Sequence, residues 1–103
     1  MDRVVESKRD CLKGICEKFA VRRLAIFGSA AEGRFRPGTS DVDALVEFEP
    51  MPPSRHADCY FCLLDELEAL FGAPVDLVEP SGIQNPYLRR SVESQKVVVY
   101  ESA

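Results

Sequence analysis

Residues 28–43 read Gly28-Ser29-Ala30-Ala31-Glu32-Gly33-Arg34-Phe35-Arg36-Pro37-Gly38-Thr39-Ser40-Asp41-Val42-Asp43. This segment follows residues 23–27, which are apolar after Arg23, and its last three residues begin a second, alternating pattern. The run 23–27 predicts a short β-strand that Gly28 ends. Residues 29–33 predict a helical turn, and residues 34–40 predict a loop because they contain proline and glycine. The segment therefore links two predicted strands through a turn and a loop.

The second of these strands, residues 41–48, shows a clear alternation of apolar and polar side chains. Successive side chains of a strand point to opposite faces of the sheet. We expect the apolar face to pack against helices and the other face to be polar. The first face would carry Val42, Ala44, Val46 and Phe48, and the second Asp41, Asp43, Leu45 and Glu47.

Two helices are predicted before and after this region. Residues 2–19 predict the first, because apolar residues recur at helical spacing among charged ones: Val5, Leu12, Ile15, Cys16 and Phe19. Prolines break the chain at residues 50–53, and we expect Ser54 to cap a second helix that Gly72 ends. Its apolar stripe would comprise Ala57, Tyr60, Phe61, Leu64, Leu67 and Phe71.

The rest of the chain predicts two more strands and one more helix. Residues 75–78 and 97–100 predict the strands. Asn85 followed by a proline predicts the start of a helix that runs to about Ser94. The sequence thus predicts an α/β (α+β) fold, a small mixed β-sheet with helices on one face. Because the chain has 103 residues, we expect one domain, residues 1–103.

Three aspartates are candidates for a metal site. Asp41 and Asp43 stand two residues apart on one strand, so both side chains project from the same face. Neighbouring carboxylates repel each other unless a cation lies between them, and Mg²⁺ prefers oxygen ligands of this kind. Asp76 is the only acid within the apolar strand 75–78. If the two strands are neighbours, the three carboxylates could hold two Mg²⁺ ions.

The glycine segment is a candidate anion site. A strand that ends at Gly28-Ser29 and opens a helical turn presents free backbone N–H groups and the positive end of a helix dipole. Gly28 and Gly33 would let the backbone approach phosphate oxygens, and the Ser29 hydroxyl could donate to one of them.

Each feature also has a purely structural interpretation. Residues 29–32 form a capping-box sequence, S-x-x-E, which needs no ligand. Asp41 could cap the loop, Asp43 could be solvated, and Asp76 could be an edge-strand charge that discourages aggregation. The two glycines could be plain turn residues. The joint occurrence of all these features in 103 residues favours a functional site.

The same residues resemble the hallmark motif of the DNA polymerase β-like nucleotidyltransferase superfamily. That motif is Gly-Ser, a short spacer, Gly, then Asp-x-Asp, and a distant third acid on a strand. Here it comprises Gly28, Ser29, Gly33, Ser40, Asp41, Asp43 and Asp76. In length, the chain is similar to the minimal nucleotidyltransferase (MNT) group, found as the antitoxin half of HEPN/MNT toxin–antitoxin pairs.

The resemblance implies a role for each motif residue. Asp41 and Asp43 would bind Mg²⁺, and Asp76 would complete the metal site and help to deprotonate the acceptor hydroxyl. The nucleotide, ATP, would be bound by Gly28, Ser29, Gly33 and Ser40. The chain departs from many relatives at Ala30, where they carry an arginine.

The resemblance also implies a reaction and a partner. The chain would transfer AMP from ATP to a tyrosine of a HEPN toxin and thereby silence it. Two other readings stay open. The chain could be a binding antitoxin that covers its toxin stoichiometrically, or a subunit of a larger enzyme that modifies small molecules.

Composition limits the remaining classes of function. A net charge of −4 argues against a dedicated nucleic-acid binder. No apolar run is long enough to span a membrane, and the charged N-terminus does not resemble a secretion signal, so we expect a cytoplasmic protein. Cys59 and Cys62 have C-x-x-C spacing, but they lie in a helical pattern without a second such pair, and His56 is the single histidine, so we do not expect a zinc site. We expect buried, unpaired thiols at Cys11, Cys16, Cys59 and Cys62.

Overall fold

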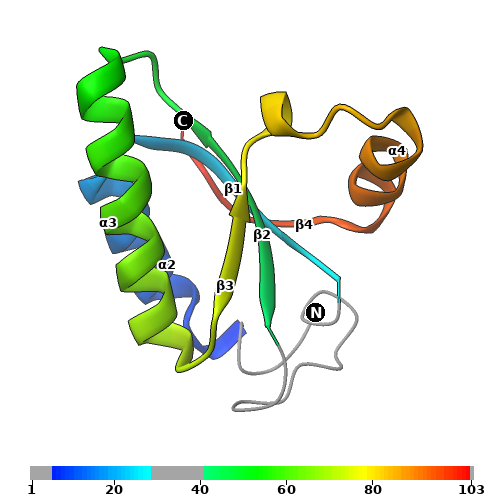
Figure 1. Cartoon of the computed structure of the whole chain (residues 1–103). Coiled ribbons are helices and arrows are strands. Elements are labelled where there is room, and N and C mark those ends of the chain that lie inside the picture. The colour runs from blue at the N-terminus through cyan, green and yellow to red at the C-terminus, as the bar shows by residue number, and fades with distance from the viewer. Residues whose placement is uncertain (1–5, 29–40, 103) are drawn as a thin grey trace.

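A computed structural model describes residues 6–28 and 41–102 (Figure 1). Every helix and strand predicted within these ranges is present. The predicted turn 29–33 and loop 34–40 lie outside the described residues. In chain order the elements are α2 (Arg9–Lys18), β1 (Val21–Phe27), β2 (Val42–Phe48), α3 (Pro53–Phe71), β3 (Val75–Val78), the 3₁₀ turn η1 (Pro80–Gly82), α4 (Pro86–Gln95) and β4 (Val97–Glu101).

The four strands form one mixed sheet in the order β3-β2-β1-β4. β1 pairs antiparallel with both β2 and β4. β2 and β3 run parallel, which requires a crossover connection, and α3 provides it. The predicted α+β fold with a mixed sheet is confirmed.

Helices α2 and α3 cover one face of the sheet, and α4 lies on the other side (Figure 1). The main core lies under α2 and α3 and includes Leu12, Leu24, Val46, Leu63 and Leu67, each 0% exposed. The predicted placement of the helices on one face holds for α2 and α3, whereas α4 lies on the other side of the sheet.

A second, smaller core lies on the opposite face and explains the position of α4. Ala25 of β1 and Leu45 of β2 are buried there against Ile83, which follows η1, and Val92 of α4. Leu45 had been grouped with the polar side chains of its strand, although it is apolar. Because this face carries apolar side chains at the centre of the sheet, it needs a cover of its own.

The predicted helix ends fit with one exception. Gly72 ends α3 in the left-handed conformation, with φ +63°. The Asn85 Oδ1 caps α4, accepting from the N–H groups of Tyr87 at 2.9 Å and Leu88 at 3.3 Å. The predicted cap at Ser54 is wrong, because α3 begins at Pro53 with Pro52 as the N-cap residue. Proline suits the first helical position, since its φ is helical and it lacks the N–H that would otherwise need a cap.

The buried face of α3 also differs from the predicted stripe. Its buried residues are Cys59, Leu63, Leu67 and Phe71, whereas Phe61 is 62% exposed. Treating the cysteine as apolar would have revealed the repeat 59, 63, 67, which places the centre of the face two residues away from Phe61. Phe61 therefore faces solvent along the side of the helix.

The thiols divide into two classes. Cys16 and Cys59 are buried, as expected, whereas Cys11 and Cys62 are exposed and contradict the expectation of burial. All four are free thiols. Within residues 6–28 and 41–102, no helix combines the length and the apolar character needed to cross a bilayer.

Candidate active site

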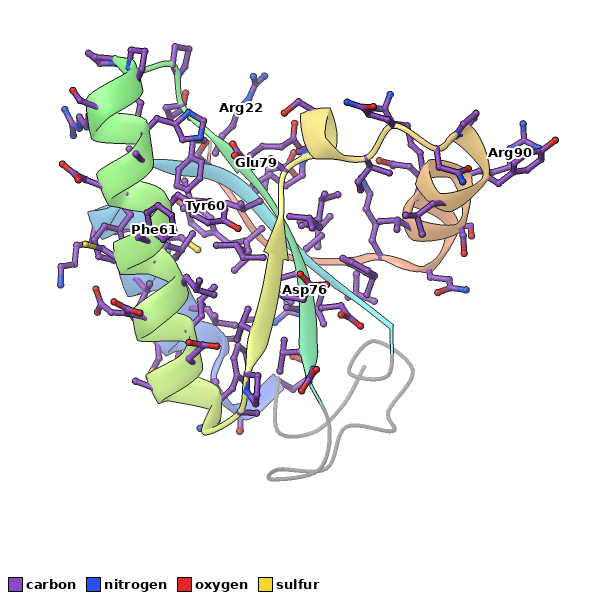
Figure 2. The ribbon with its side chains drawn as sticks, in the orientation of Figure 1. Arg22, Tyr60, Phe61, Asp76, Glu79 and Arg90 are labelled. Carbon is purple, nitrogen blue, oxygen red and sulfur yellow. The ribbon has the colours of Figure 1, made fainter. Side chains whose placement is uncertain are left out.

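The structure brings two of the three candidate aspartates together. β2 and β3 are parallel neighbours, and Asp43 and Asp76 are partners in their register. Both lie near the start of their strands, so they share one end of the sheet. Figure 2 shows Asp76 on β3, beside β2. The parallel pairing of β2 and β3, which the sequence left open, is what joins the acids.

The environment of Asp43 disfavours its negative charge. Asp43 is only partly exposed, and burial is the main cause that raises the pKa of its carboxyl group. The nearby charge of Asp76 raises this pKa further, and that of Asp41 also contributes. Asp41 itself is exposed and directly precedes β2. A cation at this point would relieve the repulsion among the three carboxylates.

Gly28 contacts Asp43 on the side of β1, opposite to the side where Asp76 of β3 lies. Phe27, the last residue of β1, is the register partner of Asp43, so Gly28 directly follows the paired position. Gly28 has φ +68°, and a Cβ atom built on it would lie 2.3 Å from Oδ2 of Asp43. Only glycine combines this backbone conformation with the space that the carboxylate occupies. Gly28, Asp43 and Asp76 therefore form a row across β1, β2 and β3.

The donors in this row fit a hard divalent cation such as Mg²⁺, which binds carboxylate oxygens together with phosphates. In the described ranges, however, no three Asp, Glu, His or Cys side chains are close enough together to hold a metal ion by themselves. One or two carboxylates are the usual protein contribution to a Mg²⁺ site that substrate phosphates complete, and the pair Asp43 and Asp76 fits that number. Ser29, Gly33 and Ser40 lie outside the described residues, so their placement stays a prediction.

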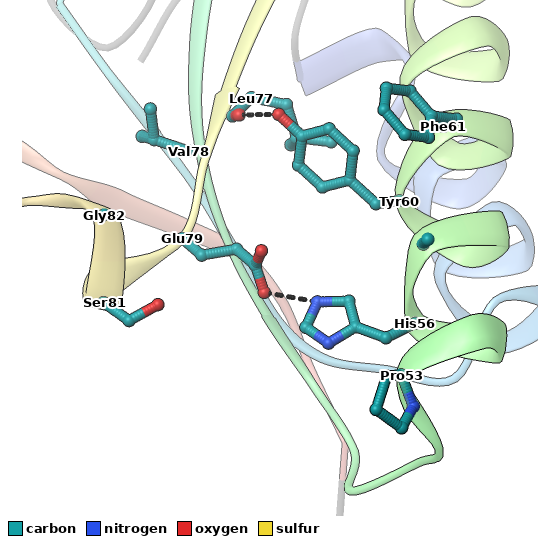
Figure 3. A pocket seen from close by; sticks show the side chains of 10 residues that line it. Pro53, His56, Tyr60, Phe61, Leu77, Val78, Glu79, Ser81 and Gly82 are labelled. Atoms are coloured by element: carbon teal, nitrogen blue, oxygen red, sulfur yellow. Dashed lines mark hydrogen bonds and ion pairs between the residues drawn. The ribbon is translucent and has the colours of Figure 1, made fainter.

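A groove that the sequence did not reveal runs along the outer side of β3. It has a volume of about 460 Å³ and lies between the first half of α3, the end of β3 and η1 (Figure 3). The His56 Nε2 and the Glu79 Oε1 lie 2.7 Å apart across it. The Tyr60 hydroxyl donates to the carbonyl oxygen of Leu77. The one sequence signal was Phe61, an aromatic residue that does not fit the true buried repeat of α3.

Residues 8–99 match the family described as the nucleotidyltransferase domain. The chain belongs to this family. The match spans β1, β2 and β3 and so includes the row of Gly28, Asp43 and Asp76.

Two relatives indicate the branch of the nucleotidyltransferase family. A Methanocaldococcus jannaschii protein named as a candidate protein adenylyltransferase is 32% identical over 99 residues, which is 96% of this chain and 97% of the relative. The protein adenylyltransferase MntA of Thermococcus cleftensis is 42% identical over 74 residues, which is 71% of this chain and 70% of that protein. The chain is thus a nucleotidyltransferase whose relatives carry the name protein adenylyltransferase.

Solved structures agree on the fold. A structure described as a candidate minimal nucleotidyltransferase superposes with a TM-score of 0.67 at 32% identity, covering 94% of this chain and 95% of that one. A toxin–antitoxin crystal structure with AMP-PNP gives 0.66 at 18% identity, covering 91% and 73%. A complex of a tri-AMPylated Shewanella oneidensis HEPN toxin with an MNT antitoxin gives 0.61 at 15% identity, covering 95% and 73%. At such low identity, the last two similarities show the fold alone.

Proposed function

We propose that this nucleotidyltransferase, with Mg²⁺, transfers AMP from ATP to a tyrosine hydroxyl of a partner HEPN toxin. The observation that carries the proposal is the pairing of Asp43 with Asp76 beside Gly28. A partly buried carboxylate such as Asp43, held close to a second negative charge, costs stability and is typical of a functional site. Relatives that are named protein adenylyltransferases support a protein as the acceptor.

The three aspartates and Gly28 have different proposed roles. In the proposed site, Asp41, Asp43 and Asp76 hold up to two Mg²⁺ ions. Bound Mg²⁺ would neutralise charge on the triphosphate and on the departing pyrophosphate. Gly28, whose missing Cβ leaves the space that the Asp43 carboxylate occupies, would let its backbone come close to the phosphates.

The remaining nucleotide contacts are assigned from the sequence motif. Ser29 would donate its hydroxyl and backbone N–H to the phosphates, and Gly33 would let the backbone approach them. Ser40, directly before Asp41, would complete this contact.

The transfer itself is a single displacement. The tyrosine oxygen attacks the α-phosphorus of ATP, and the bond from this phosphorus to the pyrophosphate oxygen breaks. Asp76, an exposed residue on the edge strand β3, helps to remove the phenol proton. A phenol, with a pKa of about 10, ionises more easily than an alkyl alcohol, which favours tyrosine as the acceptor.

The partner is proposed from the solved complexes. One of them contains an AMPylated HEPN toxin with an MNT antitoxin, and another contains a toxin–antitoxin pair with an ATP analogue. These support a HEPN toxin as the acceptor and ATP as the donor.

Intact-mass spectrometry tests the reaction. The HEPN protein encoded beside the gene for this chain is incubated with the chain, ATP and Mg²⁺. We expect its mass to rise by one or more AMP units, and Asp43→Asn to abolish the gain. Asp10→Asn is the matched control, because this substitution removes the same charge as Asp43→Asn. Asp10 is an exposed acid on α2, which covers the other face of the sheet.

The other readings predict different outcomes. An unmodified toxin in a tight complex, neutralised only at equal amounts of the two proteins, would identify a binding antitoxin. Adenylylation of free nucleosides or aminoglycosides without a partner would identify a small-molecule enzyme.

A further inference from the structure

The groove beside β3 has walls from three elements (Figure 3). α3 provides one side, the end of β3 forms the floor, and η1 forms the other side. Its lining residues are Pro53, His56, Ala57, Tyr60, Phe61, Leu77, Val78, Glu79, Ser81 and Gly82. Most of these are apolar, so the groove offers a hydrophobic surface with few polar groups.

Phe61 is the largest apolar side chain that this surface leaves in solvent, at 62% exposed. Its ring packs edge-on against Tyr60, with centroids 5.2 Å apart and an angle of 88° between the planes. The ring is thus held by Tyr60, remains mostly in solvent and contributes to the groove lining. An exposed aromatic beside an apolar groove is typical of a protein-binding surface.

The groove lining carries one carboxylate, Glu79, whose Oε1 lies 2.7 Å from the His56 Nε2, and further carboxylates lie outside the lining. Burial, then Glu79, then Asp76 raise the pKa of the Tyr60 phenol, so both carboxylates act on the groove wall. Asp58 and Asp65 are exposed and stand three residues before and four residues after Phe61, on the same side of α3. The whole chain carries a net charge of −4. An occupant with positive charges would complement this surface.

The backbone of β3 limits how an occupant can bind. The Tyr60 hydroxyl donates to the carbonyl oxygen of Leu77, and the N–H of Val75 donates to Glu68 Oε2 at 3.0 Å. Two backbone groups that a docking strand would need are therefore already used by α3. A helix, which needs no backbone partners, suits this groove better than an added strand.

The groove and Asp76 share the edge strand β3, although Asp76 is not among the residues that line the groove. Glu79 follows Asp76 by three residues along the same strand direction, which corresponds to about 10 Å. Figure 2 shows Tyr60, Phe61 and Glu79 grouped at this edge of the sheet, with Asp76 further back along β3. A partner seated in the groove would therefore bind at the same edge of the sheet that carries Asp76.

We propose that this groove docks a basic amphipathic helix of the acceptor protein. An apolar side chain of that helix lies beside Phe61 and Val78, and its Lys or Arg side chains pair with the exposed carboxylates Asp58 and Asp65. This inference rests on the proposed function in one respect, namely that the bound protein is the acceptor of AMP.

Calorimetric titration of the chain with the HEPN protein encoded beside its gene tests the proposal. We expect Phe61→Ala to weaken the complex at least tenfold, as truncation of a central aromatic anchor does. The double variant Asp58→Lys, Asp65→Lys should weaken it as well, and added salt should weaken the wild-type complex. Leu88→Ala is the matched control, since Leu88 is 53% exposed on α4, across the sheet from the groove. We expect it to change the affinity less than about twofold.

The outcomes separate the groove from the reaction. Asp43→Asn should abolish AMP transfer and leave the complex intact, whereas Phe61→Ala should weaken the complex and leave ATP binding unchanged. A wild-type complex that Phe61→Ala weakens, without any AMP transfer, would support the groove and refute the proposed reaction. Unchanged affinity in the Phe61 and Asp58/Asp65 variants, or no complex with the wild type, would overturn the groove assignment. A photo-crosslinker at position 61 should attach to a basic helix of the toxin, and attachment elsewhere would also overturn it.

Discussion

At the scale of single residues, the candidate active site depends on contacts between strands. Gly28 has no side chain because the carboxylate of Asp43 occupies the position of its Cβ atom. Asp43 in turn faces Asp76 across the parallel pair of β2 and β3. Asp43 therefore restricts position 28 to glycine and feels the charge of Asp76.

Gly28→Ala is predicted to reduce both stability and activity. Its positive φ costs about 1 kcal/mol in alanine, and the clash with Asp43 adds about 1–3 kcal/mol unless the carboxylate moves away. Gly72→Ala is the matched control, since Gly72 has a similar φ of +63° but nothing within 4 Å of its Cβ position. Urea unfolding and AMP-transfer assays measure the two effects. Equal stability and equal activity of the two variants would refute the contact.

The four thiols are predicted to react in two groups. Burial raises the pKa of Cys16 to about 12, with a smaller contribution from the charge of Glu17, so its thiol stays protonated at neutral pH. The thiolate is the reactive form, and a buried thiol is also inaccessible to reagents. Ellman's reagent should therefore label Cys11 and Cys62 quickly and label Cys16 and Cys59 only in denaturant. Fast reaction of all four in native buffer would contradict this prediction.

At the scale of elements, the sequence predicted those features that depend on a few neighbouring residues. The order of helices and strands followed from periodicity, and the cap at Asn85 followed from its position before a proline. The three aspartates were found from their positions within strands. These signals require only a few neighbouring residues.

Features that depend on strand pairing were not predictable in the same way. The choice of β2 as the neighbour of β3 joined Asp43 to Asp76, and no local pattern states that choice. The cover of Leu45 by α4 and the exposure of Phe61 likewise depend on which faces meet in three dimensions. The groove was missed for the same reason, because its walls come from separate elements.

Asn85→Ala is predicted to destabilise the protein by about 1 kcal/mol, since it removes the side-chain cap of α4. The Asn85 oxygen accepts two backbone N–H groups that have no partner within the helix. Ser94→Ala is the control at the other end of α4, where the hydroxyl bonds only to the exposed carbonyl oxygen of Ser91. Thermal unfolding should show a clear fall in midpoint for the first variant and a small change for the second. Equal midpoints would show that the cap contributes nothing.

At the scale of the whole molecule, the site lies on the sheet face that has the smaller hydrophobic core. The main core under α2 and α3 contains most of the buried apolar side chains, whereas the opposite face has only the small core under α4. Asp43 and Asp76 occupy that second face, at the end where β1 stops and β2 and β3 start. Because the fold carries repelling charges there, binding of a cation and a nucleotide should stabilise the entire domain.

Asp43→Asn is accordingly predicted to make the free protein more stable while it removes activity. The substitution relieves the repulsion from Asp76 and Asp41 and keeps the shape of the side chain. We expect a gain of roughly 0.5 kcal/mol, because solvent partly screens these charges. Asp10→Asn, which removes an exposed charge from the first turn of α2, should leave stability unchanged or slightly lower. Mg²⁺ with a non-hydrolysable ATP analogue should raise the unfolding midpoint of the wild type and of Asp10→Asn, and EDTA should reverse the effect. The same rise in Asp43→Asn would show that Asp43 takes no part in binding the metal, since a ligand stabilises only the folded state that it binds.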